Sequence, residues 1–74
     1  MLYYQKNGMI FYKLDQINKS YVEIFNNGST QFRLVEIKNE NLYNQIIQKI
    51  EDFEYSVTTE ENFNQVLSLT KSKF

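Results

Sequence analysis

Residues 21–37 read YVEIFNNGSTQFRLVEI, in which two runs of alternating apolar and polar residues flank Asn26-Asn27-Gly28. Alternation with a period of two is typical of a β-strand that buries one face. An Asn-Gly pair between two such runs favours a tight hairpin, because both residue types tolerate positive φ. The stretch therefore predicts two antiparallel strands joined by a short loop.

Two loop lengths fit this hairpin, and they place different side chains on each face. A two-residue loop pairs Phe32 with Glu23, which sets an apolar side chain against a charged one. A three-residue loop with a left-handed Gly28 and a glycine bulge separates the two kinds of side chain. We expect the three-residue loop, which gives the core face the pairs Val22–Phe32, Ile24–Thr30 and Ser20–Leu34 and the solvated face the pairs Tyr21–Arg33 and Glu23–Gln31.

The first fourteen residues form a second hairpin pattern around Asn7-Gly8, which is typical of a type I′ turn with positive φ at both residues. We expect a two-residue loop here, and the ladder pairs that follow from it are Lys6–Met9, Tyr4–Phe11 and Leu2–Lys13. The opposite face is also largely apolar, with Tyr3, Ile10, Tyr12 and Leu14. A hairpin that is apolar on both sides needs cover on both sides.

After the predicted strands come two segments whose apolar residues recur at helical spacing. Asn39 favours an N-cap, and apolar residues recur at helical spacing over residues 42–53. A short extended segment is expected over residues 53–57. Thr58 and Glu61 then have the spacing of a capping box, and the second helix presents one face made of Phe63, Val66, Leu67 and Thr70.

This order of elements, strands first and helices afterwards, is typical of an α+β fold. We expect residues 1–74 to form a single small domain. Its sheet is predicted to be an antiparallel β-meander of two successive hairpins with three to four strands. The two helices are predicted to pack together on one face of that sheet.

The composition excludes several classes of site. The chain contains no cysteine and no histidine, so it has no disulfide, no thiol nucleophile and no histidine acid, base or metal ligand. The carboxylates gather at expected helix ends, where capping and solvation explain them, at Glu51, Asp52, Glu54, Glu60 and Glu61. We therefore expect no enzymatic activity, no catalytic residue, no cofactor and no metal.

The leading functional hypothesis is a small non-enzymatic protein–protein interaction module, such as a regulator, inhibitor or accessory factor. Tyr and Phe are abundant in the chain, and aromatic residues are enriched in interface cores. Small domains also often gain stability by association. We expect a homodimer, an unidentified protein partner, or both, with the interface formed by Leu2, Tyr4, Met9 and Phe11.

The alternative hypothesis is a module that binds single-stranded nucleic acid. Aromatic side chains on an open sheet stack with unpaired bases, and the candidate face contains Tyr21, Phe25 and Arg33. A surface that follows a phosphate backbone is normally basic, whereas this chain has a formal net charge of −1. Nucleic acid is therefore the less favoured partner.

Two further features of the sequence concern its context. No apolar run approaches the length of a membrane span, and the first residues do not resemble a signal peptide, so we expect a cytoplasmic protein without membrane contact. Residues with AT-rich codons are abundant, whereas Ala, Pro, Gly and Arg together amount to Gly8, Gly28 and Arg33. This bias indicates an AT-rich genome, such as that of a low-GC bacterium, its phage or another virus.

Overall fold

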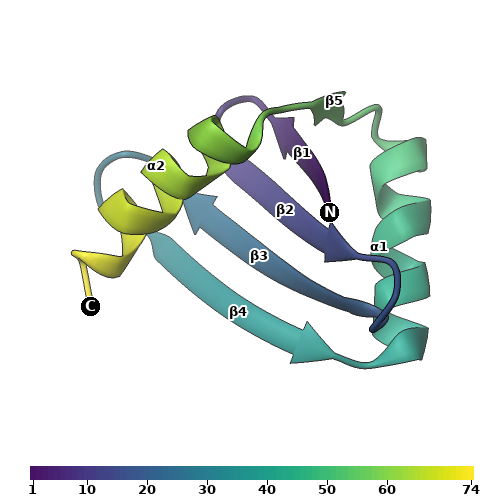
Figure 1. Cartoon of the computed structure of the whole chain (residues 1–74). Coiled ribbons are helices and arrows are strands. Elements are labelled where there is room, and N and C mark those ends of the chain that lie inside the picture. The colour runs from purple at the N-terminus through teal and green to yellow at the C-terminus, as the bar shows by residue number, and fades with distance from the viewer.

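The computed structural model describes all 74 residues and contains one antiparallel sheet and two helices (Figure 1). Four strands precede both helices, which confirms the predicted α+β meander. In chain order the elements are β1 (Leu2–Lys6), β2 (Ile10–Asp15), β3 (Ser20–Asn26), β4 (Phe32–Lys38), α1 (Glu40–Asp52), β5 (Ser56–Val57) and α2 (Glu60–Lys71). Across the sheet the strand order is β4-β3-β2-β1-β5.

The sheet has five strands, whereas the sequence predicted three to four. The additional strand, β5, lies within the extended segment expected over residues 53–57. It pairs antiparallel with β1 through Gln5–Ser56 and Tyr4–Val57. Two residues are too few to show an alternating pattern, so the sequence indicates an extended conformation without indicating that it joins the sheet.

The two helices cover opposite faces of the sheet, which corrects the prediction that both pack on one face. The buried cluster on the first face, here the α1 face, contains Tyr12, Leu14, Tyr21, Tyr43 and Ile50. The cluster on the second face, here the α2 face, contains Phe11, Ile24 and Phe63. Because successive strand residues point to opposite faces, both faces of β2 are apolar and each needs its own helix. Between the helices, β5 carries the chain along β1 (Figure 1).

The β1–β2 hairpin forms the predicted turn with a different register. Asn7 and Gly8 have φ values of 58° and 67°, and the Met9 N–H donates to the Lys6 carbonyl at 3.1 Å. The ladder nevertheless pairs Lys6 with Ile10, one residue beyond the predicted pair. Met9 is left out of this ladder, and its carbonyl accepts a hydrogen bond from the Asn26 N–H of β3 at 2.9 Å. The shift sets apolar side chains opposite each other, in the pairs Tyr4–Tyr12 and Leu2–Leu14.

The β3–β4 hairpin has a longer loop than predicted. The observed pairs are Asn26–Phe32, Ile24–Leu34 and Val22–Glu36, four residues from the predicted register, so the loop covers residues 27–31 instead of three residues. The Asn27 side chain explains the length, because its Oδ1 accepts hydrogen bonds at 3.0, 3.1 and 3.1 Å from the N–H groups of Ser29, Thr30 and Gln31. Gly28 is left-handed at φ +83°, as predicted.

A register shift by an even number of residues keeps every side chain on its face. Ile24 and Leu34 therefore still share a face, which α2 covers. The other face was predicted to be solvated, and Gln31 and Arg33 are exposed as predicted. The prediction was wrong for the β3 part of that face, because α1 packs on it and Tyr21 is only 8% exposed. Glu23 lies on that covered face with its side chain 15% exposed.

Both helices begin with side-chain caps. The Asn39 side chain accepts a hydrogen bond from the Leu42 N–H at 3.0 Å, as predicted for an N-cap. In α2 the N-cap is Thr59, one residue after the predicted Thr58, and it accepts from the Asn62 N–H at 3.0 Å. Two consecutive threonines offer the same chemistry, so the sequence pattern does not decide between them.

Replacing Phe63 with alanine tests the packing of α2. Phe63 is fully buried at the centre of the α2-face cluster, so the substitution should lower the free energy of unfolding by about 3–5 kcal/mol. In the same helix, Leu69 is 62% exposed, and Leu69→Ala should change it by less than about 0.5 kcal/mol. Urea denaturation measures the free energy of unfolding of each variant. Equal losses for Phe63→Ala and Leu69→Ala would contradict the packing of α2 through Phe63.

Candidate functional site

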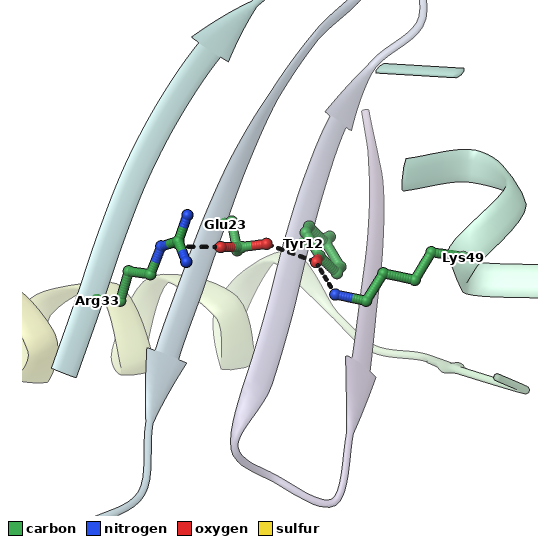
Figure 2. A network of polar contacts seen from close by, with 4 residues as sticks. All are labelled: Tyr12, Glu23, Arg33 and Lys49. Carbon is green, nitrogen blue, oxygen red and sulfur yellow. Dashed lines mark hydrogen bonds and ion pairs between the residues drawn. The ribbon is translucent and has the colours of Figure 1, made fainter. Parts of the chain in front are cut away.

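A chain of polar contacts crosses the α1 face (Figure 2). The Tyr12 hydroxyl of β2 donates a hydrogen bond to Glu23 Oε2 of β3 at 2.6 Å. Arg33 Nε of β4 lies 3.2 Å from Glu23 Oε1, and Lys49 Nζ of α1 donates to the Tyr12 hydroxyl oxygen at 3.0 Å. Four elements therefore meet at one carboxylate and one phenol.

The electrostatics of this cluster keep the Tyr12 hydroxyl protonated. Burial raises the pKa of Tyr12, and the hydrogen bond to the Glu23 carboxylate raises it further. Lys49 Nζ also lies 5.5 Å from the centre of the Tyr12 ring, within cation–π range. Because the hydroxyl stays protonated and donates a hydrogen bond to Glu23, the phenol has a structural role and is a poor nucleophile at neutral pH.

A pocket of about 250 Å³ lies beside this network and is lined by Ile10, Glu23, Phe25, Arg33 and Lys49. Two of the three residues of the predicted nucleic-acid face, Phe25 and Arg33, therefore reach one surface depression. The third, Tyr21, is buried beneath α1. Arg33 has the more exposed side chain of the Glu23–Arg33 ion pair, at 66%.

The four residues of the predicted interface do not come together on one surface. Leu2 and Tyr4 are half-buried and pack against the α1-face cluster. Phe11 is 3% exposed beneath α2, on the opposite face. Met9 is 37% exposed at the hairpin. The one-residue register shift in the β1–β2 hairpin separates Tyr4 from Phe11, since it moves them to different faces.

The outer edge of β4 is a feature that the sequence patterns did not identify. β4 is the terminal strand of the sheet and has a neighbour only on its β3 side (Figure 1). The Asn27 N–H donates to the Gln31 carbonyl at 3.2 Å, so the pair 27–31 is hydrogen-bonded. Because bonded and non-bonded pairs alternate in an antiparallel ladder, the backbone groups that point away from the sheet belong to Phe32, Leu34, Glu36 and Lys38.

The two edges of the sheet differ in length and in cover. At one edge β5 has only two residues, whereas at the other β4 has seven residues in unbroken register with β3. Natural proteins protect sheet edges with short strands, bulges, proline or charged side chains. β4 has no bulge and no proline, and its only such protection is the charged side chains of Arg33, Glu36 and Lys38. All four of its apolar side chains remain half-buried, namely Phe32, Leu34, Val35 and Ile37.

The structure and the comparisons with known proteins also bear on metal sites, membrane-spanning helices and relatives of the chain. No three Asp or Glu side chains converge in a geometry that could hold a metal ion. Neither helix has the length and apolar character needed to cross a membrane. Comparisons of the chain with protein-family models, with curated proteins and with solved structures give no significant match.

Replacing Tyr12 with phenylalanine tests the polar network. The substitution removes the donor to Glu23 and the acceptor for Lys49, and hydrogen bonds to charged groups contribute about 1.5–3 kcal/mol each. We expect the free energy of unfolding to fall by about 1.5–3 kcal/mol, the contribution of the bond to Glu23, because water can replace the bond to the partly exposed Lys49. Tyr4→Phe is the control, since Tyr4 belongs to the same cluster and makes no side-chain hydrogen bond. Equal denaturation midpoints for the two variants would contradict the role assigned to Tyr12.

Buried tyrosines predict a loss of stability at alkaline pH. Burial is the main cause that raises the pKa of Tyr12, Tyr21, Tyr43 and Tyr55. In the unfolded chain these groups ionise near pH 10, so above about that pH the unfolded state holds fewer protons than the folded state. The free energy of unfolding should therefore be constant from pH 7 to about pH 9 and fall above about pH 10. Urea titrations from pH 7 to 11 measure it, and a flat profile would contradict the assignment.

Proposed function

We propose that this chain is a non-enzymatic protein–protein interaction module that binds a strand of its partner along the outer edge of β4. The observation that carries the proposal is the row of outward backbone groups at Phe32, Leu34, Glu36 and Lys38. Main-chain hydrogen bonds at such an edge supply affinity, and alternate side chains supply specificity. The cytoplasmic location expected from the sequence belongs to this proposal.

The side chains of β4 support strand addition. A partner strand beside β4 would cover the exposed parts of Leu34 on the α2 face and of Val35 and Ile37 on the α1 face. Arg33 does not block the approach on the α1 face, because its guanidinium group reaches back to Glu23 of β3 (Figure 2). The edge therefore combines free hydrogen-bonding groups with apolar surface that is only partly buried.

Binding of single-stranded nucleic acid has less support than strand addition. The face predicted for base stacking is covered by α1, and Tyr21 is buried. The pocket is lined by one aromatic side chain, Phe25, and by two cations, Arg33 and Lys49. The Glu23 carboxylate, which also lines the pocket, is paired with Arg33. A formal net charge of −1 gives little general attraction for phosphate.

A proline at position 36 tests the function. The Glu36 N–H points outward from β4, so Glu36→Pro removes a donor that the sheet itself does not use, and edge strands tolerate proline at such positions. Glu36→Thr removes the same charge and keeps the N–H, which makes it the matched control. Proteins captured from the native cell by the wild type and Glu36→Thr, and lost with Glu36→Pro, would be partners of the edge.

Circular dichroism and urea denaturation establish that both variants are folded before capture. A set of captured proteins that is the same for Glu36→Pro and Glu36→Thr would contradict the proposal, because no bound protein would then depend on the outward donor of β4.

A further inference from the structure

We infer that β4 pairs with β4 of a second copy of this chain, antiparallel and centred on Val35, so that two five-stranded sheets become one continuous sheet. This inference rests on the proposed function, since it names the partner of the same edge. The symmetry of the pair is a twofold axis perpendicular to the sheet. Under that symmetry, both α1 helices lie on one side of the joined sheet and both α2 helices on the other.

The outward backbone groups of β4 are arranged symmetrically about Val35. Phe32 and Lys38 lie three residues on either side of it, and Leu34 and Glu36 lie one residue on either side. In a pair centred on Val35, each outward residue meets an outward residue of the second copy. The four residue pairs exchange two hydrogen bonds each, so all eight outward N–H and C=O groups of β4 in each copy find partners.

Other registers satisfy fewer of these groups. A one-residue slip would set outward groups against inward ones and place opposite faces together. A two-residue slip in either direction reduces the four hydrogen-bonded pairs to three within the bounds of β4. One of those slips also sets Glu36 directly opposite the partner's Glu36, and like charges in that position are destabilising. The full overlap is therefore the favoured register.

The side chains fit this register. On the α1 face, Val35 meets the partner's Val35 at the twofold axis, a pair of β-branched residues of the kind that stabilises neighbouring strands. Ile37 lies opposite the partner's Arg33, whose guanidinium group is held over β3 by Glu23 within its own chain. On the α2 face, Leu34 lies opposite the partner's Glu36. The half-buried apolar side chains of β4 thereby gain neighbours on their open side.

Two substitutions at position 36 remove the same charge with opposite expected results. In the inferred dimer the two Glu36 carboxylates lie diagonally across the axis and repel each other, so Glu36→Thr should lower the dimer dissociation constant severalfold. Glu36→Pro removes a donor from the central hydrogen bonds and should give a monomer. Light scattering after size exclusion, over a concentration series, should show twice the monomer mass for the wild type and Glu36→Thr and the monomer mass for Glu36→Pro.

A cysteine at the twofold axis tests the register. The chain has no cysteine of its own, and the Val35 pair would be a non-hydrogen-bonded pair with Cα atoms about 4.5 Å apart, within disulfide range. Val35→Cys should therefore form a cross-linked dimer in oxidised glutathione. Arg33→Cys is the control, because the two substituted positions would lie four residues apart along the strands, at about 13 Å, and should stay uncross-linked.

The outcomes separate this inference from the proposed function. A wild type that is monomeric at high concentration, or a dimer that persists in Glu36→Pro, would overturn the self-pairing. The edge would then keep its proposed role only if Glu36→Pro still loses proteins that Glu36→Thr captures. If Glu36→Pro does not fold, the cross-linking of Val35→Cys decides the inference alone, and equal cross-linking of Arg33→Cys would overturn it.

Discussion

Burial of both faces of one small sheet is the constraint on which the rest of the structure depends. Phe11 and Tyr12 are consecutive in β2, so they point to opposite faces, and neither is more than 3% exposed. Each helix covers one face, so the chain needs two helices and a connecting segment that runs from one face of the sheet to the other. This connecting segment contains β5, which pairs with β1 and thereby covers the β1 edge of the sheet. The same path leaves the β4 edge without a neighbour.

Covering the α1 face also explains the polar network. Glu23 shares that face with Tyr21, so its carboxylate is partly removed from water when α1 packs. A carboxylate in that position needs donors to offset its lost hydration, and the Tyr12 hydroxyl and the Arg33 guanidinium group supply them. The ion pair with Glu23 also directs the Arg33 side chain over β3 and away from the outer edge of β4. The Arg33 charge, which would otherwise protect the β4 edge on the α1 face, is instead paired with Glu23 of β3 at the surface.

The sequence predicted the order of elements, the Asn39 cap and the positive-φ turn at Asn7-Gly8, because each depends on local chemistry. It did not predict the hairpin registers. The four-residue shift in the β3–β4 hairpin follows from side-chain hydrogen bonds of Asn27 within the loop, which the alternation of the strands does not show. The side of the sheet that each helix covers depends on β5, whose two residues carry no pattern. The free edge of β4 follows from that topology, so no local signal indicates it.

The open edge and the small core both follow from the small size of the fold. Nine of the 74 residues are buried, and small domains bury a smaller fraction of their surface than large ones. Each helix covers one face of the sheet, and no further element lies beside β4. The apolar side chains of β4 are therefore held in place on the β3 side and left half-exposed on the other. Pairing at this edge extends the sheet and its two apolar layers without any change in the fold, because the outward backbone groups are already aligned by the ladder with β3.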